Sequence, residues 1–577
     1  MSFIMETPVS LEFLQAARER DFRRINALIL AGKSINASDK DGYTALHRAA
    51  IQNPEDLNTI SILISYGAIK DTVHEEEQAG RYRTPLHYAA IQGNVELVAL
   101  LLNMGADPAP QHLKDWRTPL EDAISNGHVS VVEKMIQCFI YGSLGYRPSK
   151  GLAEAIILAS RLWYSDVLIL LLEYRNRFLP SGTIPQMVLK QALCEAIQAE
   201  ACGVSMQPFD ERIGEPGDHT PTKVADLLIR AGINFKPEEL DRLLSTTCRN
   251  SNLIGVTRLL LNLEATVTSY HIVCAIESRN IHMVKLLIPP FITNGGQSST
   301  GADEPDLVQY AAGHGTPEMF EYLYETFDAP KRSGSLHRPR PRRTPLIHYA
   351  VWGLQREMIK YLLDTARSHV HETDDLGHTP LMYAFDDIDT TKERTRLPVL
   401  QLLIEQGSDV RARSTDGLTA LHLAVRMGSI DIVRLLLNKG SDPNAKAMSC
   451  DSVYLKRNPV CRDPTGILYS RTPLHWAVDP LATVSLDVVR ALLRFGADVN
   501  EPDGNNATPL NILLGDGWGD QVWEPRAAVA ELLMKYGADA DIEDKMGRTA
   551  RDHGLVLGVG WGWNWVGEFR DCFGLDL

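Results

Sequence analysis

A short motif recurs along this chain, and it limits the possible folds more than any other feature. It is threonine followed by proline or alanine and, in all but the last copy, by leucine. The copies begin at Thr44, Thr84, Thr118, Thr344, Thr379, Thr419, Thr472, Thr508 and Thr549. Successive copies lie 34 to 53 residues apart, except across one gap of 226 residues. Self-similarity with a period of about 20–50 residues indicates an array of small repeated units.

A second motif closes most of these units. It is a run of leucines that ends in glycine, as in LLNMGADP at 101–108, LLLNKGSDPN at 435–444 and LLRFGADVN at 492–500. Threonine before proline indicates a helix start. The threonine hydroxyl can accept a hydrogen bond from an N–H of the first helical turn, and proline at the first helical position loses no hydrogen bond because an N–H there has no partner within the helix. Glycine after the leucines is typical of a left-handed C-cap. Each unit is therefore predicted to be two short helices that bury their apolar faces only by stacking on neighbours.

Together the two motifs resemble the ankyrin repeat, whose pattern is T-P-L-H-x-A-A, then G-x-x-x-V-V-x-x-L-L, then G-A-D-x-N. The resemblance implies an all-α, ankyrin-type solenoid of stacked helix-turn-helix repeats with β-turn fingers. It also implies that one histidine per unit ties adjacent turns by hydrogen bonds. These histidines are His47, His87, His422 and His475. We expect a weaker tie in the copies that carry Glu121, Ile347, Met382 and Asn511.

The quality of the repeat divides the chain into four parts. We predict N-terminal ankyrin repeats at 1–145, degenerate ankyrin-like repeats with insertions at 146–341, C-terminal ankyrin repeats at 342–546 and a tryptophan-rich C-terminal cap at 547–577. The central part keeps paired apolar runs at helical spacing, so we interpret it as degenerate repeats and not as a foreign domain. The total would be about fourteen repeats. Trp561, Trp563 and Trp565 are expected to cover the last apolar face.

Composition and charge argue against several classes of protein. Lys and Arg number 58 against 73 Asp and Glu, a formal net charge of -15, so a nucleic acid is not an expected partner. We see no signal peptide and no apolar run long enough to cross a membrane. The eight cysteines lack C-x-x-C spacing, which favours free thiols in a reducing compartment. We therefore expect an intracellular, cytoplasmic or nuclear, monomeric protein with no cofactor and no metal.

The sequence holds near misses to catalytic motifs. Gly32-Lys33-Ser34 lacks the first glycine of a phosphate-binding loop, and the run from His74 to Gln78 lacks the second histidine of a zinc protease motif. We therefore predict that the protein is not an enzyme. One alternative is an enzyme whose active site lies in the degenerate central repeats; another is a regulatory subunit of a separate enzyme. Acid, base and nucleophile candidates for the first are Glu154, Glu195, Asp210, Glu211, His219, His271, Cys274, Glu277, His282 and His314.

Several insertions interrupt the repeats and are candidate recognition loops, because such loops lie on the surface of a repeat array. The longest, 446–469, carries Cys450 and Cys461; the others are 202–222, 291–305, 386–397 and 515–526. The segment KRSGSLHRPRPRR at 331–343 holds six basic side chains. Such a run is typical of a nuclear-import signal or anion patch, and also of a solvated Pro-Arg linker.

The predicted function is a non-catalytic protein–protein interaction scaffold or adaptor that uses the concave face and the turn tips. The resemblance implies partner contacts at the turn tips and on the exposed side of the first helix. In the second to fourth units these positions are Tyr43, Gln52, Arg81, Arg83, Gln92, Trp116, Arg117 and Asn126. In later copies they are His378, Leu418, Arg426 and Met427. Arginine, tryptophan and tyrosine are enriched at interface hot spots, so the third and fourth units are predicted to form the best patch.

Overall fold

The computed structural model is composed mainly of paired helices. It describes residues 9–76, 81–109, 117–141, 149–180, 184–201, 220–296, 306–327, 344–365, 368–385, 390–447, 470–479, 485–515 and 523–552. The basic segment 331–343, Cys450, Cys461 and the three C-terminal tryptophans lie outside these residues. None of the helices in the described residues is long and apolar enough to span a lipid bilayer.

The chain divides into two compact units. The first comprises Met1–Ser278 and Lys285–Asn294, and the second comprises Arg279–Val284 and Gly295–Leu577. The helix α16 (Ile281–Thr293) contributes residues to both. This division by contacts differs from the division by repeat quality at 145 and 341, which stays a prediction.

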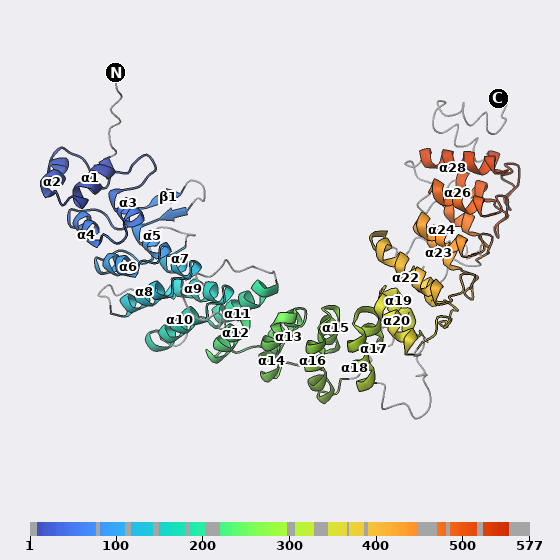
Figure 1. Ribbon diagram of the computed structural model, residues 1–577, viewed down its shortest axis with the longest axis horizontal. Coiled ribbons are helices and arrows are strands. Elements are labelled where there is room, and N and C mark those ends of the chain that lie inside the picture. Colours follow the sequence, from blue (N-terminus) through green and yellow to red (C-terminus); the bar gives the residue numbers. More distant parts are fainter. Residues whose placement is uncertain are drawn as a thin grey trace, which may run out of the picture. The chain divides into compact units, whose positions relative to one another are not determined.

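The first unit begins with four helix pairs (Figure 1). They are α1 (Val9–Arg18) with α2 (Phe22–Leu30), α3 (Ala45–Gln52) with α4 (Leu57–Ser65), α5 (Pro85–Ile91) with α6 (Val95–Asn103), and α7 (Pro119–Ser125) with α8 (Val129–Tyr141). The first helices pack in a row, α1 on α3, α3 on α5 and α5 on α7, and the second helices form a parallel row. Each pair therefore buries its apolar face against the next pair, as the repeats predict.

The loop between α4 and α5 is a lengthened finger. The strands β1 (His74–Glu76) and β2 (Arg81–Arg83) pair antiparallel, with His74 opposite Arg83. This hairpin places Arg83 directly before Thr84, the N-cap of α5.

The two rows of helices continue where the sequence motif fades. The helices are α9 (Ser149–Arg161), α10 (Ser165–Phe178), α11 (Gln186–Ala201), α12 (Pro221–Arg230), α13 (Pro237–Cys248), η1 (Ser251–Leu253), α14 (Ile254–Asn262) and α15 (Ser269–Glu277). α9 packs on α7, α11 on α9 and α13 on both α11 and α15, while α10, α12 and α14 extend the second row. The apolar spacing explains this continuity: Val167, Leu168 and Leu171 are buried on one face of α10.

The second unit repeats the arrangement. Its elements are α17 (Leu307–His314), α18 (Pro317–Phe327), α19 (Leu346–Trp352), α20 (Arg356–Asp364), α21 (Pro380–Tyr383), η3 (Thr390–Lys392), α22 (Glu393–Glu405), α23 (Ala420–Met427), α24 (Ile430–Asn438), α25 (Pro473–Ala477), α26 (Leu486–Arg494), α27 (Pro509–Leu514) and α28 (Trp523–Lys535). The first helices α17, α19, α21, α23, α25 and α27 pack successively on one another. The predicted all-α stack of paired helices with turn fingers is thus confirmed.

Candidate functional site

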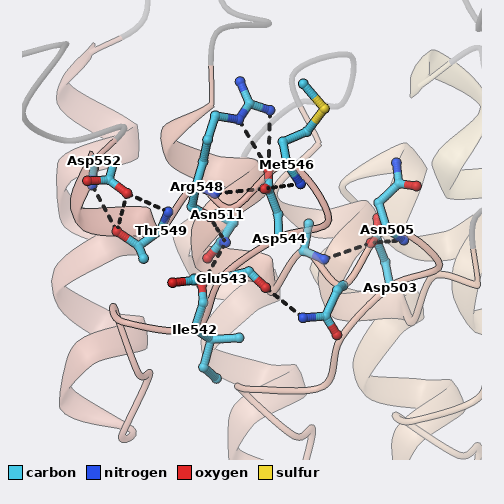
Figure 2. Close-up of polar contacts among 12 residues, drawn as sticks. Asp503, Asn505, Asn511, Ile542, Glu543, Asp544, Met546, Arg548, Thr549 and Asp552 are labelled. Carbon is cyan, nitrogen blue, oxygen red and sulfur yellow. Dashed lines mark hydrogen bonds and ion pairs between the residues drawn. The ribbon is translucent and has the colours of Figure 1, made fainter.

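Four of the described fingers are tight turns that one aspartate closes, and in the finger before α23 Ser414 Oγ takes this role by accepting from the N–H of Leu418 at 3.1 Å. In the last finger, Asp544 Oδ1 accepts hydrogen bonds from the N–H groups of Met546 and Arg548 at 2.7 and 2.9 Å (Figure 2). Asp39, Asp374 and Asp503 accept bonds from backbone N–H groups two and four residues later in the same way. The turn needs a residue with positive φ, which Gly547 supplies at 71°.

Neighbouring fingers are joined to each other by hydrogen bonds to backbone carbonyls. The N–H of Lys545 donates to the carbonyl of Asn505 at 2.9 Å. The Nδ2 of Asn506 donates to the carbonyl of Glu543 at 2.6 Å. The fingers therefore present side chains from a hydrogen-bonded frame.

The repeated histidines make the tie that the resemblance implies. In each unit Nε2 donates to the carbonyl just before the threonine of the next unit: His47 to Arg83 at 3.2 Å, His87 to Arg117 at 3.0 Å, His422 to Arg471 at 3.2 Å and His475 to Ala507 at 3.2 Å. Nδ1 accepts a hydrogen bond from the backbone N–H of the N-cap threonine in the same four units. Because a carbonyl only accepts, the ring proton is on Nε2. Burial lowers the pKa of all four rings to about 4.

The expectation of a weaker tie is wrong for two of the four altered copies. Asn511 takes over the role of the histidine, since its Nδ2 donates to the carbonyl of Ile542 at 3.1 Å. In the copy with Ile347, α19 starts one residue later than the motif predicts, and the Nε2 of His348 donates to the carbonyl of His378 at 3.0 Å. The imidazole at the following position could have signalled this shift.

Glu121 occupies the histidine position of the fourth unit. Its Oε2 accepts a hydrogen bond from the N–H of Thr118 at 3.1 Å. Burial raises the pKa of the Glu121 carboxyl to about 7, an effect that hydrogen bonding to Thr118 opposes. This unit therefore carries a carboxyl that changes charge near neutral pH.

The predicted site residue Tyr43 belongs to a half-buried aromatic cluster. Its ring stacks on His74 with centroids 3.7 Å apart, and the Arg48 guanidinium lies 4.3 Å from its centroid. His74 bonds the hydroxyl of Tyr88 through Nδ1 and donates to the carbonyl of Asp41 through Nε2, both at 2.9 Å. Tyr43 thus helps to hold the base of the finger in place.

The predicted arginines have different surroundings. Arg83 is half-buried, forms an ion pair with Asp122 at 3.9 Å and lies over the ring of Tyr88. Arg117 is exposed, and its Nη1 donates to Ser125 Oγ at 2.9 Å. The side chain of Arg81 and the whole of Trp116 lie outside the described residues.

The predicted amide side chains form a row. Gln52, Gln92 and Asn126 are all exposed and stand at the C-terminal ends of α3, α5 and α7. Gln92 Nε2 donates to the carbonyl of Ile51 in the preceding unit at 3.0 Å. Since these three helices pack in succession, the structure brings the amide row together on one edge of the first unit. Arg117 reaches this edge, because its side chain contacts Ser125, the neighbour of Asn126.

Three of the four residues expected to be presented by later copies are buried, so that expectation is wrong for them. His378, Leu418 and Met427 retain 1%, 2% and 7% exposure, while Arg426 is half-buried. His378 turns inward because its Nδ1 pairs with Asp374 Oδ2 at 3.0 Å. The apolar side chains of Leu418 and Met427 are removed from water, which favours the buried position.

An open polar pocket lies in the degenerate stretch, and sequence reasoning did not find it. It has a volume of about 680 Å³ and is lined by Glu238, Asp241, Arg242, Ser245, Thr246, Arg249, Asn250 and Tyr270. The catalytic candidate His271 lies beneath it, fully buried. Its Nδ1 accepts from the N–H of Thr268 at 3.0 Å and its Nε2 donates to the carbonyl of Asp241 at 3.2 Å.

This arrangement does not favour catalysis at the pocket. Both nitrogens of His271 are engaged, and burial lowers the pKa of its ring, so it is poorly suited to abstract a proton. Cys274 is also buried. The candidates Asp210, Glu211 and His219 lie outside the described residues. In the part of the chain that the structure describes, no three His, Cys, Asp or Glu residues gather closely enough to hold a metal ion.

Comparison with protein families finds ankyrin repeats in this chain. The family described as "Ankyrin repeats (3 copies)" matches residues 13–112, 74–144 and 357–447, and "Ankyrin repeat" matches 469–504. These matches fall in both compact units. The total of about fourteen repeats stays a prediction.

Similar curated proteins share the repeats over part of their length. "Putative ankyrin repeat protein FPV031" of Fowlpox virus (strain NVSL) is 32% identical over 142 residues, which are 21% of this chain and 41% of that protein. "Palmitoyltransferase ZDHHC13" of Homo sapiens is 35% identical over 105 residues, 18% of this chain and 16% of that protein. The Mus musculus protein of the same name is 24% identical over 262 residues, 42% of this chain and 38% of that protein.

The chain thus spans well under two thirds of the length of these relatives. The similarity to the palmitoyltransferases is confined to ankyrin repeats, so it shows no catalytic domain. Ankyrin repeats are generally non-catalytic and suggest protein–protein interaction.

Proposed function

We propose that this chain, which contains ankyrin repeats, is a non-catalytic scaffold that binds protein partners through its fingers and the exposed side of its first helices. The observation that supports the proposal is the amide row of Gln52, Gln92 and Asn126 beside the exposed Arg117. These side chains offer hydrogen-bond donors and acceptors at successive repeats.

The hydrogen-bonded frame beneath the row favours binding. His47 ties its own unit to the backbone of Arg83, and His87 ties the next unit to the backbone of Arg117. A surface that is already ordered loses less conformational freedom when a partner binds, so more of the contact energy appears as affinity. A regulatory subunit of a separate enzyme would be one form of the same activity.

The proposal is tested by affinity capture with the full chain, followed by quantitative mass spectrometry. The double variant Gln52→Lys, Arg117→Glu changes exposed side chains only, and we expect it to recover its specific partners at least about tenfold less well. The matched control is Arg23→Glu, an exposed charge change in α2, which should recover them normally. Equal recovery by all three proteins would refute this binding surface.

The cellular compartment is a separate proposal. The acidic composition and the basic segment 331–343 support a protein that resides in the cytoplasm and enters the nucleus. A fluorescent fusion in which Arg338, Arg340, Arg342 and Arg343 are replaced by alanine should lose its nuclear fraction. Unchanged distribution would favour a solvated linker instead.

A further inference from the structure

The polar pocket of the first compact unit is built almost entirely by one helix. Seven of its eight lining residues belong to α13 or to the two residues that follow it, and Tyr270 comes from the neighbouring α15. Figure 1 shows these two helices adjacent in the row of first helices. The pocket is therefore part of the same face that the first helices present in the other repeats.

Absence of a finger explains why this face is open. Only residues 263–268 join α14 to α15, whereas residues 495–508 join α26 to α27 and include a finger. The histidine tie is reversed as a result. His271 Nε2 donates back to the carbonyl of Asp241 in α13 at 3.2 Å, whereas His87 Nε2 donates forward to the carbonyl of Arg117 in the next unit at 3.0 Å. Tyr270, the second residue of α15, keeps 52% of its surface exposed.

The charges in the pocket are ordered along α13. Glu238 and Asp241 lie near its N-terminal end, Arg242 follows, and Arg249 comes directly after its C-terminal end. Glu238 and Arg242 form no side-chain hydrogen bond or ion pair with any other residue that the structure describes. Two exposed charges of opposite sign are therefore available at different points of one helix face.

The middle of the pocket offers acceptors and an apolar surface. The hydroxyls of Ser245 and Thr246 donate to backbone carbonyls of α13 at 2.9 and 3.0 Å, so their oxygens can still accept hydrogen bonds. Tyr270 keeps half of its surface exposed and offers area for an apolar side chain beside Arg249, whose Nη2 donates to the Tyr270 hydroxyl at 2.6 Å.

We propose that this pocket binds an extended peptide segment of a partner protein, with a basic side chain at one end and an acidic side chain at the other. The basic group would pair with Glu238 and Asp241, and the acidic group with Arg242 and Arg249. The eleven-residue step from Glu238 to Arg249 spans about 16 Å of helix, which about five extended residues cover. The two carboxylates disfavour a polyanion such as a nucleic acid, because like charges in one site repel.

This inference rests on the proposed scaffold function and names the partner chemistry at a second surface. The test pans a phage-displayed library of random peptides on the full chain. We expect enriched sequences with a basic and an acidic residue about five positions apart. Synthetic copies of these peptides should bind the variant Arg242→Glu, Arg249→Glu at least about tenfold more weakly, because two attractive contacts become repulsive.

Two controls make the result specific. Arg258→Glu reverses an exposed charge on α14, in the same helix pair but outside the pocket, and should leave peptide binding unchanged. The inverted pocket Glu238→Arg, Asp241→Arg, Arg242→Glu, Arg249→Glu should recover binding of peptides whose charged ends are exchanged. Circular dichroism of each variant establishes that it is folded.

Enrichment of peptides without the charge pattern, no enrichment at all, or equal binding to the Arg242→Glu, Arg249→Glu variant would overturn the inference. If partner capture still depends on Gln52 and Arg117 in that case, the scaffold function stands and only the pocket inference fails. If partner capture does not depend on Gln52 and Arg117 but the peptides still bind, the proposed scaffold surface fails and the pocket inference stands.

Discussion

At the scale of single residues, His47, His87, His422 and His475 each bond two backbone groups that belong to different repeats. The Nδ1 of His422 accepts from the N–H of Thr419 and its Nε2 donates to the carbonyl of Arg471. The Thr419 N–H depends on Nδ1, because a buried backbone donor without a partner destabilises the fold. The Arg471 carbonyl also accepts from the N–H of Ala447 at 2.9 Å. Asn511 shows that a carboxamide can also link two repeats. Its Oδ1 accepts a hydrogen bond from Thr508 Oγ1, and its Nδ2 donates to the carbonyl of Ile542 in the next unit.

We therefore expect His422→Leu and His422→Asn to differ. The leucine variant leaves the Thr419 N–H unsatisfied and removes one of the two hydrogen bonds to the Arg471 carbonyl, which still accepts from the N–H of Ala447 at 2.9 Å. It should lose about 2 kcal/mol of unfolding free energy. The asparagine variant should lose about half as much. Urea unfolding monitored by circular dichroism measures both, and equal losses would mean that the hydrogen bonds contribute little.

At the scale of elements, backbone contact sets how closely two first helices approach. A Cβ placed on Gly353, at the end of α19, would lie 1.7 Å from the carbonyl oxygen of Gly313 in α17. A separation this short is impossible between non-bonded atoms, so only glycine permits the observed packing of α17 on α19. The start of α19 is likewise decided by its neighbour, since His348 reaches the carbonyl of His378.

Gly353→Ala should thus force α17 and α19 apart and destabilise the second unit by about 1–3 kcal/mol. The control is Gly151→Ala in α9, where the nearest atom to a new Cβ is Thr118 Cγ2 at an ordinary 3.6 Å. That change should stabilise its helix by about 1 kcal/mol. Thermal unfolding followed by amide hydrogen exchange in each unit provides the measurement, and a neutral Gly353→Ala would disprove the close contact.

At the scale of the whole molecule, several repeats each contribute a buried histidine. His47, His87, His348, His422 and His475 all have a pKa lowered to about 4, with burial as the largest cause. An exposed histidine in the unfolded chain titrates near 6.5. Both compact units contain such rings, so low pH should destabilise each unit.

The sign of the pH dependence follows from these values. Above about pH 6.5 the five rings are neutral in both states and their stabilisation is complete. As the pH falls from 6.5 to 4 the unfolded chain binds protons first, and each ring loses up to about 3 kcal/mol of its contribution. Glu121 opposes this trend, because its pKa is raised to about 7 and its contribution is lost as the pH rises from about 4.3 through 7.

Five groups outweigh one, so the unfolding temperature should rise as the pH increases from 4 to 6.5. Differential scanning calorimetry across this range tests the prediction. His87→Asn removes one ring and should reduce the slope relative to the original chain. A flat profile would contradict the neutral, buried state of the rings.

The sequence determined the features that depend on adjacent residues. Thr-Pro pairs start helices such as α25 and α27, and glycine closes fingers at positive φ, as at Gly547. The leucine runs predicted the second helices, and the alternation of these signals predicted the stack. The amide row followed from the resemblance because it recurs at one position of consecutive units.

Tertiary structure alone decided features that depend on partners 30 or more residues away. The shift of the tie from Ile347 to His348, the role of Asn511 and the reversed bond of His271 all involve a carbonyl in another repeat. The pocket on α13 depends on which fingers are present between neighbouring helices. Local sequence fixes dihedral angles and caps, whereas exposure and hydrogen-bond direction are set by the packing of one unit on the next.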